Sequence, residues 1–514
     1  MRFLVARGIA ALVCCLFSIQ AFAAETEKSA PPSGSKPIFD GKSLEGWDGN
    51  PKFWRVEEGA IVGQTTAENP TEGNTFLIWK QGELDDFELT LDYKIIGGNS
   101  GIQYRSTDHG NWVVGGYQAD FESGDTYSGI NYEERGRGIL CERGQRVTIK
   151  ADGSKVPGEK IGDSAEIQKK INKEDWNSYK IVASGNKLSH FINGQLTSEV
   201  IDEQADKRKL SGILALQLHA GPPMTVMFRD IHLKRTKLAA VDPIGPRKKL
   251  VLVAGSPSHG PGDHEFNAGS QLLKKCLAQQ TPQLVTALYK GGWPQDPTAY
   301  DNADGIMLYM DGGGGHPVIQ RNRLAEIDNL MKQGVGLACA HYAVEVPKEK
   351  GGPDFLNWIG GYFEMHWSVN PHWDAQMQSL PQHPITNGVQ AFKLNDEWYY
   401  HMRFREKMEG VTPILTAVAP ESTVGNDGPH SGNPTVRAAV KNKEPQHLAW
   451  AYERPDGGRG FGYTGGHFHR NWRDDNNRKL YLNALLWICK LDVPAEGVQS
   501  SVSEVDMKEN LDPK

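Results

Sequence analysis

The hydrophobic pattern of this chain changes once, at the segment Ala239–Lys249, and that change constrains the fold more than any other feature. Before it, short runs of alternating apolar and polar residues, such as DFELTLDYKI, are separated by Gly and Asn, which is typical of an antiparallel β-sandwich. After it, near-continuous apolar runs such as KLVLVAGS alternate with helical segments, which is typical of a parallel α/β sheet. Because 514 residues also exceed a single hydrophobic core, we predict two domains with different folds.

The first residues have the pattern of a secretory signal. Arg2 and Arg7 precede a short apolar run that ends at Ala21-Phe22-Ala23, a typical cleavage site. The run is too short to span a bilayer comfortably, so an uncleaved anchor is the weaker alternative and we expect a periplasmic or secreted protein. The expected segments are a signal peptide at 1–23, a flexible lead-in at 24–36, the sandwich at 37–236, a linker at 237–247, the α/β domain at 248–490 and a polar, frayed tail at 491–514.

Charge and cysteine content narrow the class of partner. The formal net charge is −7, and cleavage of the signal would remove two arginines, so nucleic acid is disfavoured. The four cysteines outside the signal are widely spaced and resemble neither a disulfide framework nor a CxxC metal site. We expect a small-molecule partner and no stable membrane insertion after cleavage, while the sequence does not indicate an oligomeric state.

Polar side chains recur at spacing two in the predicted sandwich, which places them on one face of each strand. Such a face is often simply solvated, but three strands that present amide, carboxylate, guanidinium and imidazole groups suggest a sugar-sized polar site. Aromatic side chains nearby could stack on a sugar ring. The candidate catalytic residues are Asp120, His219, Arg105 and Glu122, and the candidate substrate-binding residues are Asn99, Gln103, Tyr117, Gln118, Gln217 and Trp176.

An ordered series of blocks in residues 37–236 resembles the 3-keto-disaccharide hydrolase family: FWRVEEGAIVG, DFELTLDYKI, GGNSGIQYRS, GYQADF and LALQLHAG. The resemblance implies a concanavalin-like jelly-roll sandwich that acts on an oxidised glycoside as a 3-keto-glucoside lyase or a 3-keto-2-hydroxyglucal hydratase. A ketone at C3 acidifies the C2 proton, so this chemistry needs a base, an acid for the leaving group and an electrophile near the enolate oxygen. We expect Asp120 or His219 as base and acid, Glu122 as a weaker candidate, and Arg105 or a bound metal at the enolate.

Two other functions remain open for the sandwich. A laminarinase-type glucanase would need three carboxylates along one strand, and Gln118 stands where the first is required, so two-carboxylate glycoside hydrolysis is disfavoured. A non-catalytic sugar-binding module that serves an enzymatic second domain is the alternative from another class, since one fold hosts several functions.

In the second half, several histidines follow predicted strands. The carboxyl ends of parallel strands form the ligand-binding edge of an α/β sheet, so these side chains predict one shared pocket. A divalent metal is a possible cofactor, although no HExxH or other close ligand spacing occurs. Glu397 could equally cap a local turn. The candidate residues are His259, His264, His316, His341, Glu397 and His467.

This half resembles the trehalose-utilisation (ThuA-like) domains through KLVLVAGSPSHGPGDHEFNAGSQLL, YDNADGIMLYMDGGG, GVGLACAHYA and GRGFGYTGGHFHRNW. The resemblance implies a flavodoxin-like fold related to class I glutamine amidotransferases, in which a strained elbow presents a nucleophilic cysteine. In GLACAH the elbow position falls on His341, and Cys339 lies two residues earlier, deeper in the sheet. We therefore expect Cys339 to be a buried inert thiol and the domain to bind or process the keto-sugar without amidotransferase activity.

Overall fold

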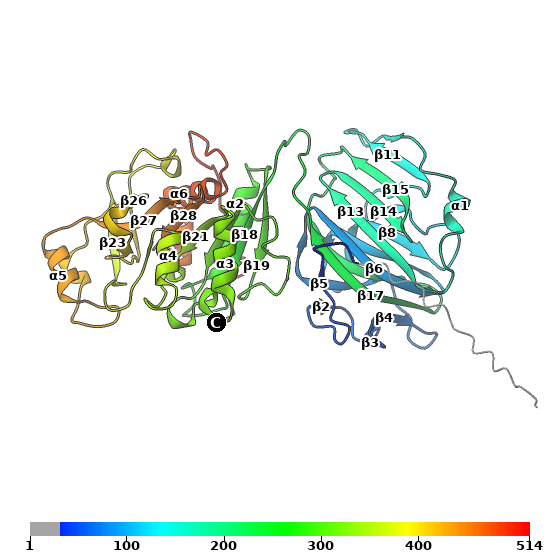
Figure 1. Ribbon diagram of the computed structural model, residues 1–514, viewed down its shortest axis with the longest axis horizontal. Helices are drawn as coiled ribbons and strands as arrows, with labels where there is room; N and C mark the ends of the chain where they lie inside the picture. Colours follow the sequence, from blue (N-terminus) through cyan, green and yellow to red (C-terminus); the bar gives the residue numbers. More distant parts are fainter. Residues whose placement is uncertain (1–30, 514) are drawn as a thin grey trace, which may run out of the picture.

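The structure, a computed structural model, describes residues 31–513, so the expected signal peptide lies outside the described residues. It contains an all-β body and an α/β body side by side, joined by a segment that crosses between them (Figure 1). Within residues 31–513, no helix has the length and apolar character needed to cross a bilayer.

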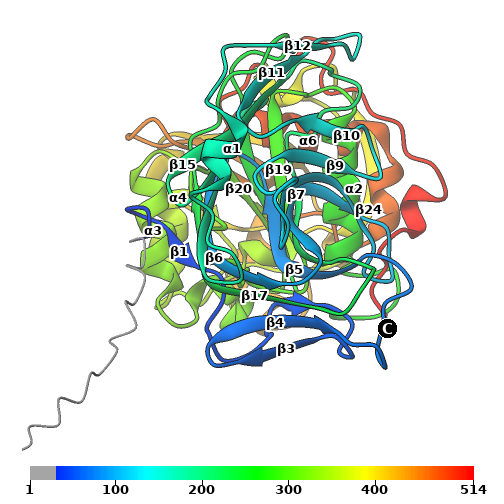
Figure 2. The same ribbon diagram turned by 90° about the vertical axis from the view of Figure 1, so that its right-hand side faces the viewer.

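The first body is a sandwich of two sheets, which lies in front in Figure 2. Nearly all neighbouring strands are antiparallel; β11 and β15 run parallel. The ten-stranded sheet contains, in spatial order, β12 (Lys155–Pro157), β11 (Gln145–Ile149), β15 (Gln195–Asp202), β14 (Lys187–Ile192), β13 (Asn177–Ser184), β6 (Phe87–Ile96), β17 (Met224–Arg235), β4 (Ala60–Thr65) and β3 (Trp54–Glu57), with β1 (Lys36–Pro37) paired to β17. The seven-stranded sheet contains β10 (Gly138–Cys141), β9 (Asn131–Glu134), β8 (Val114–Glu122), β7 (Asn99–Asp108), β16 (Gly212–Leu218), β5 (Thr75–Leu84) and β2 (Trp47–Asp48), and one short helix, α1 (Ser164–Gln168), lies in a connection.

Period-two alternation builds the core of the sandwich. Along β6, Leu89, Leu91 and Tyr93 are buried while the residues between them are partly exposed. In β8 the odd-numbered residues Tyr117, Ala119 and Phe121 join the same core, which leaves the even-numbered side chains on the outer face of the seven-stranded sheet. The predicted jelly-roll sandwich is therefore confirmed.

The second body is built on a mixed seven-stranded sheet. Its order is β19 (Leu284–Tyr289), β18 (Lys248–Ala254), β20 (Gly305–Tyr309), β21 (Gly336–Ala340), β28 (Arg459–Tyr463), β27 (Gln446–Glu453) and β26 (Val411–Ala417), and the first five strands are parallel. This 2-1-3-4 order has its topological switch point between β18 and β20, as in flavodoxin-like folds. The predicted α/β class is confirmed.

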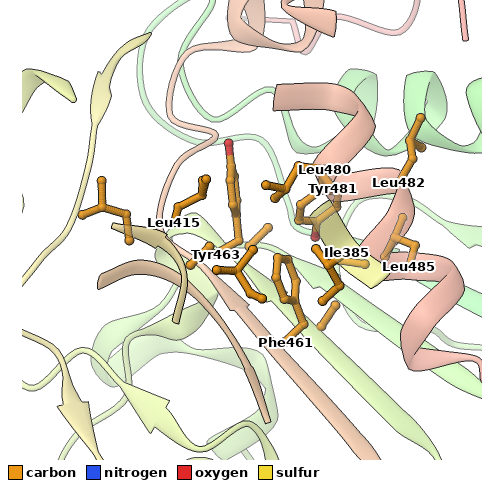
Figure 3. Packing of buried hydrophobic residues seen from close by; sticks show 14 of the residues in the cluster. Ile385, Leu415, Phe461, Tyr463, Leu480, Tyr481, Leu482 and Leu485 are labelled. Atoms are coloured by element: carbon orange, nitrogen blue, oxygen red, sulfur yellow. The ribbon is translucent and has the colours of Figure 1, made fainter. Parts of the chain in front are cut away.

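Helices cover both faces of this sheet. One face packs against α2 (Phe266–Ala278) and α6 (Asp475–Ile488), and Figure 3 shows Leu480, Tyr481 and Leu485 of α6 beside Phe461 and Tyr463 of β28. The other face packs against α3 (Arg323–Lys332) and α4 (Gly352–Trp358). The remaining elements are α5 (Pro434–Lys441), the strand pairs β22 (Gly361–Tyr362) with β25 (Arg403–Phe404) and β23 (His372–Met377) with β24 (Phe392–Glu397), and the 3₁₀ turns η1 (Gly313–Gly315), η2 (Pro317–Ile319), η3 (His341–Val344), η4 (Pro384–Thr386), η5 (Glu406–Met408), η6 (Glu421–Thr423), η7 (His469–Arg473) and η8 (Asp506–Lys508).

The C-terminal tail differs from the prediction that it is frayed. Val498 and Met507 are buried in the core that contains α2 and α6. The backbone N–H of Asp512 donates to Glu265 at 2.8 Å, and its carboxylate accepts a hydrogen bond from Asn267 at 2.6 Å. The prediction failed because two widely separated apolar residues in a polar segment give no periodic signal, yet each fills a place in the core.

Candidate functional site

A pocket of about 410 Å³ opens on the outer face of the seven-stranded sheet of the sandwich. Strands β7, β8 and β9 and the residues that follow β16 contribute its walls. Five predicted residues lie together here: Asn99, Gln118, Asp120, Glu122 and His219. The volume and the mixture of amide, carboxylate and imidazole groups suit a small polar ligand.

Asp120 is the most unusual side chain of this pocket. It is 5% exposed and, among the described residues, forms no ion pair. Burial raises its pKa to about 8, and hydrogen bonds from Gln118 and Asn99 offset only part of that effect. The carboxyl is therefore largely protonated at neutral pH and titrates close to it, which is the property that a proton-transfer group requires.

A relay of amides fixes the orientation of Gln118. Gln118 Nε2 donates to Asp120 at 3.1 Å, and its Oε1 accepts from Gln103 Nε2 at 2.6 Å. Ser106 donates to Gln103 Oε1 at 2.7 Å, and Gln217 Oε1 accepts from Gln118 at 3.3 Å. Gln103 and Gln217 are fully buried, so they hold Gln118 from beneath instead of contacting a ligand as predicted.

His219 and Glu122 flank Asp120 but are held differently. His219 Nδ1 lies 2.6 Å from the carbonyl oxygen of Ala220, so this nitrogen carries the proton and Nε2 is the acceptor. One carboxylate oxygen of Glu122 accepts the backbone N–H groups of Thr126 and Tyr127, at 2.7 and 2.9 Å. Glu122 thus fastens the loop after β8, which makes it a weaker candidate for proton transfer than Asp120.

Besides Gln103 and Gln217, three further predicted residues do not line the pocket. Arg105 is buried on the far side of the strand, where it donates to the carbonyl oxygens of Asp85 and Gly185 and pairs with Asp86 at 2.8 Å. A bulge shifts the β7–β8 register between Tyr104 and Thr107, and Arg105 itself has φ +48°, so spacing two no longer predicts its direction. Tyr117 points into the core and donates to Asp202 at 2.6 Å, and Trp176 packs under Arg229 on the other sheet.

Three polar residues of the pocket lining were missed by sequence reasoning. Tyr132 and Glu134 come from β9, where alternation alone would have placed them on one face. Asn74 precedes β5, and its side chain accepts the N–H of Ala220 at 3.0 Å while it donates to Glu134 at 3.4 Å. No local pattern signals a loop residue of this kind.

A second group of polar side chains gathers at the carboxyl edge of the parallel sheet. His264, His341, His467 and Glu397 place one nitrogen or oxygen each within 4.8 Å of all the others. His264 Nε2 lies 3.0 Å from both His341 Nε2 and His467 Nδ1. Glu397 Oε2 lies 3.3 Å from His341 Nε2 and 3.2 Å from His467 Nδ1. We refer to these four residues as the His₃Glu cluster.

The parts of the fold that carry the His₃Glu cluster are the ends of separate strands. His264 lies in the loop after β18, His341 directly follows β21, His467 follows β28, and Glu397 ends β24. His264 and His341 have φ values of +48° and +53°, a left-handed conformation that costs energy for a non-glycine residue. Strain of this kind is concentrated at functional sites, and His341 occupies the elbow after its strand.

Burial sets the charge of the cluster. Burial, together with the nearby histidines, lowers the pKa of His264 far below its usual range, so this imidazole is neutral. Burial alone would raise the pKa of Glu397, but hydrogen bonds and charge from His341 and His467 outweigh it and hold the pKa well below the ordinary value. Burial alone would lower the pKa of His467, but its hydrogen bond to Glu397 and the charge of that carboxylate raise it. The cluster therefore combines a carboxylate with three imidazole rings, which are the donor types of a transition-metal site.

Among the other predicted histidines, His259 borders the cluster and His316 does not. The His259 ring lies 3.6 Å from the ring of His264, and its side chain is exposed. His316 is fully buried: Nε2 faces the carbonyl oxygen of Ala343 at 3.1 Å and Nδ1 accepts the N–H of Val318 at 3.1 Å. Both nitrogens serve the backbone, and burial lowers the pKa of His316 to about 4, so the prediction that it lines the site is wrong.

Cys339 points away from the cluster, into the face of the sheet covered by α3 and α4. It is fully buried, and burial raises the pKa of its thiol well above the ordinary value. Because His341 and not a cysteine occupies the elbow, the domain has the frame of an amidotransferase without its nucleophile.

Among the described residues, clusters of three or more potential metal ligands occur only in the α/β body. The sequence analysis named a bound metal as one way to stabilise an enolate beside Asp120. Among the described residues, the geometry of the sandwich gives no support for that metal.

Comparison with known proteins adds family relationships to this geometry. Residues 34–234 match the 3-keto-alpha-glucoside-1,2-lyase-like domain family, and residues 251–488 match the trehalose utilisation (ThuA) family. No curated protein matches the chain.

Similar solved structures each cover one part of the chain. A candidate glycosyl hydrolase from Parabacteroides distasonis is 20% identical, with 39% of this chain and 99% of that one covered and a TM-score of 0.27. The carbohydrate-binding module CBM66 from Bacillus subtilis is 14% identical, with coverage of 37% and 95% and a TM-score of 0.26. A candidate ThuA-like protein from Bacteroides uniformis is 15% identical, with coverage of 49% and 96% and a TM-score of 0.36. By these two matches, residues 34–234 form a 3-keto-alpha-glucoside-1,2-lyase-like domain and residues 251–488 a ThuA domain within one chain.

Proposed function

We propose that this protein is an exported carbohydrate-active enzyme that cleaves 3-keto-glycosides, by β-elimination and hydration, in the pocket of the sandwich. The observation that carries the proposal is the buried, unpaired carboxyl of Asp120 at the wall of a sugar-sized pocket, with a pKa of about 8. A solvated strand face would leave an aspartate at its ordinary pKa. The family match and the name of its reaction support the substrate class.

The proposed reaction begins with proton removal. Asp120, as its carboxylate, takes the proton from C2, and the electron pair is delocalised onto the C3 carbonyl oxygen as an enolate. Because Arg105 lies outside the pocket and Gln118 donates to Asp120 and Gln217, the side-chain amide of Asn99 is the donor available to stabilise that oxygen. The hydrogen bond from Gln103 keeps the NH₂ group of Gln118 directed toward Asp120.

The enolate then expels the substituent at C1. The C1–O bond breaks, a C1=C2 double bond forms, and the leaving oxygen receives the Nε2 proton of His219, which begins the step as an imidazolium and ends it neutral. In the hydration step a water molecule adds its hydroxyl to C1 and gives its remaining proton to His219 Nε2, while a proton returns to C2 from Asp120. The sum of the two steps is hydrolysis of the glycosidic bond, without a glycosyl-enzyme intermediate.

The test compares two carboxylate variants in the full chain. With a 3-keto-glucoside as substrate, Asp120→Asn should lower kcat on the order of 10²-fold or more while sugar binding persists. Asp152→Asn, in an exposed turn of the same domain, should retain wild-type turnover. Reaction in D₂O should place deuterium at C2 of the product, and kcat/KM should rise as pH increases through about 8.

Three outcomes would overturn the assignment. Product without deuterium at C2 excludes the enolate route. Unchanged turnover in Asp120→Asn removes Asp120 from the reaction. A kcat/KM that falls through pH 8 makes Asp120 the acid and reverses its role with His219.

The second candidate function is a carbohydrate-binding sandwich attached to a sugar-processing ThuA domain. The His₃Glu cluster favours it, because that cluster offers a reactive site independent of the sandwich. Turnover that survives Asp120→Asn but disappears in His341→Ala would support this second function.

A further inference from the structure

We propose that the His₃Glu cluster binds one divalent transition-metal ion, so that the ThuA domain carries a metal centre of its own. The proposal does not depend on the chemistry of the sandwich pocket. It rests on four observations: the direction of the imidazole protons, the separations of the donor atoms, the type of donor, and the path to solvent.

The second nitrogen of each histidine faces an oxygen acceptor. His341 Nδ1 lies 2.9 Å from the carbonyl oxygen of Thr464, and His264 Nδ1 lies 3.3 Å from Asp311. On the third histidine, His467 Nε2 lies 3.7 Å from Asp263. In a neutral imidazole the nitrogen that donates to an acceptor carries the proton, so the Nε2 atoms of His341 and His264 present lone pairs; the 3.7 Å contact of His467 is too long to fix its tautomer in the same way. An outer oxygen that fixes the tautomer is also the usual environment of a metal-bound histidine.

Those lone pairs converge on one another. His264 Nε2 and His341 Nε2 are 3.0 Å apart, although neither carries a proton in the tautomers set by Asp311 and Thr464. Glu397 Oε2, a further acceptor, lies 3.2–3.3 Å from His467 Nδ1 and His341 Nε2. Four electron-pair donors this close repel each other unless a metal ion or a shared proton lies between them, and the Tyr399 hydroxyl, 3.3 Å from His341 Nε2, brings only one donor hydrogen to the group.

The separations match the edges of a coordination polyhedron. Donors about 2.0–2.1 Å from a metal lie about 3.3–3.4 Å apart in a tetrahedron and about 2.9–3.0 Å apart in an octahedron. Four of the six separations in the cluster are 3.0, 3.0, 3.2 and 3.3 Å, and the other two lie within 4.8 Å. Three imidazoles and one carboxylate favour a transition metal such as Zn²⁺ over Ca²⁺ or Mg²⁺, which prefer oxygen ligands.

The site is buried on one side and reaches solvent on the other. His264 and His341 have almost no exposed surface, whereas the Glu397 side chain is 14% exposed. Exposed His259 and His372 border this opening; His372 Nε2 lies 3.8 Å from Glu397 Oε1. An ion here would keep a position open to solvent, as catalytic metal sites do, and its Lewis acidity together with polar neighbours suits the carbonyl and hydroxyl oxygens of a sugar.

The competing arrangement is a shared proton. If His341 were an imidazolium, its Nε2–H could donate to His264 while Glu397 balances the charge. That arrangement holds the same atoms together without any ion, and it predicts that the protein binds no transition metal at this place.

The experiment titrates the chelator-treated full chain with Co²⁺ and Zn²⁺. We expect one Co²⁺ per chain, with visible absorption bands of nitrogen- and oxygen-bound cobalt that Zn²⁺ abolishes. His264→Ala and the nearly isosteric Glu397→Gln should weaken binding more than 100-fold, and Asp311→Asn, which only orients His264, about 10–100-fold. The matched control is His447→Ala, since His447 lies in the same domain and contacts Thr416.

Two results would overturn the proposal. One is a wild-type chain that binds no stoichiometric Co²⁺ or Zn²⁺, which is the outcome for a shared proton. The other is a stoichiometric site that Glu397→Gln and His264→Ala leave unchanged. Because Glu397→Gln preserves the shape of the side chain, it keeps the test decisive even where His264→Ala fails to fold. Circular dichroism shows whether each variant is folded.

Discussion

Arg247 donates from Nη2 to both carboxylate oxygens of Asp86, at 2.7 and 2.8 Å, and neither side chain is accessible to solvent. Asp86 directly precedes β6 in the sandwich, whereas Arg247 ends the segment that leads into the α/β domain. Arg105 adds a third contact to the same carboxylate at 2.8 Å. The connection between the domains is therefore packed against the sandwich, and the expected linker at 237–247 is not a free tether.

Further buried charges cross between the two domains. Arg235, at the end of β17, pairs with Asp85 at 3.2 Å and with Asp296 of the α/β domain at 3.1 Å. Lys249 of β18 reaches back to Asp85 at 3.3 Å. A buried charge is strongly destabilising when its partner is removed. A cut between the domains would expose several of these charges to solvent or leave them without a counter-charge. Point variants of the full chain are for this reason a better probe of each site than isolated domains.

Asp86→Ala should destabilise the protein strongly. Removing the carboxylate leaves the guanidinium groups of Arg105 and Arg247 buried without a counter-charge, which costs about 3–5 kcal/mol. Urea unfolding followed by circular dichroism measures the change. Asp301→Ala is the matched control, because its pair with Lys36 crosses the same interface but is partly exposed, and its loss should cost about 0–1 kcal/mol. A cost for Asp86→Ala no larger than that of the control would contradict a stabilising role for the network.

The raised pKa of Asp120 predicts a pH-dependent cost in stability. A carboxyl with a higher pKa in the folded state binds its proton more tightly there than in the unfolded state. The stability that this proton gives the folded state is therefore fully present below about pH 3.8 and is lost as pH rises through about 8. Asp120→Asn removes this titration. The free energy of unfolding of the variant, measured in urea at pH 5 and pH 9, should therefore increase relative to wild type at the higher pH.

Asp152→Asn provides the comparison for this pH series. Hydrogen bonds from Ser154 lower the pKa of Asp152, so that its titration lies below the measured range. The difference between this variant and wild type should be the same at pH 5 and pH 9. If the difference in free energy of unfolding between Asp120→Asn and wild type is also the same at both pH values, the Asp120 carboxyl of the wild-type protein is already ionised at neutral pH. The proton-transfer role of Asp120 then loses its basis.

Strand alternation predicts the sandwich site only where the register is regular. Gln118, Asp120 and Glu122 share a face of β8 because no bulge interrupts them. Arg105 could not be placed from sequence, since the bulge in β7 rotates it to the opposite side. Gln103 and Gln217 lie on the predicted face, but they are fully buried and hydrogen-bond Gln118 from below the pocket. How deep a side chain lies in a site depends on tertiary packing, which residue spacing does not encode.

In the α/β domain, position after a strand was informative because parallel strands end at one edge. His264, His341 and His467 follow three such strands and lie together. His316 also follows a strand, yet the glycine-rich turn before it folds its ring inward onto the backbone. The convergence of the imidazole lone pairs depends on Thr464 and Asp311, and contacts of that kind between distant segments leave no trace in local sequence.

Cys339→Ala should leave turnover and metal binding unchanged. The thiol is buried on the side of the sheet away from the His₃Glu cluster, and the loss of its sulfur costs about 1–2 kcal/mol of stability through the cavity that remains. The native thiol should also resist iodoacetamide, because burial raises its pKa and blocks access. Mass spectrometry after alkylation measures this. Rapid modification of Cys339 in the folded protein, or loss of turnover in the alanine variant, would restore it as a candidate nucleophile.

Metal binding should stabilise the protein in proportion to the occupancy of the His₃Glu cluster. An ion that binds the folded state alone contributes RT ln(1 + [L]/Kd), or about 2.7 kcal/mol at a free concentration 100-fold above Kd. Urea unfolding of the chelator-treated chain with and without Zn²⁺ should show this increase, whereas Ca²⁺ should give none because imidazole is a poor ligand for it. Glu397→Gln should lose the response to Zn²⁺, and His447→Ala should keep it, since only Glu397 supplies a donor atom to the cluster. An equal response in both variants would locate the stabilising ion elsewhere, because the cluster without its carboxylate cannot bind Zn²⁺ with unchanged affinity.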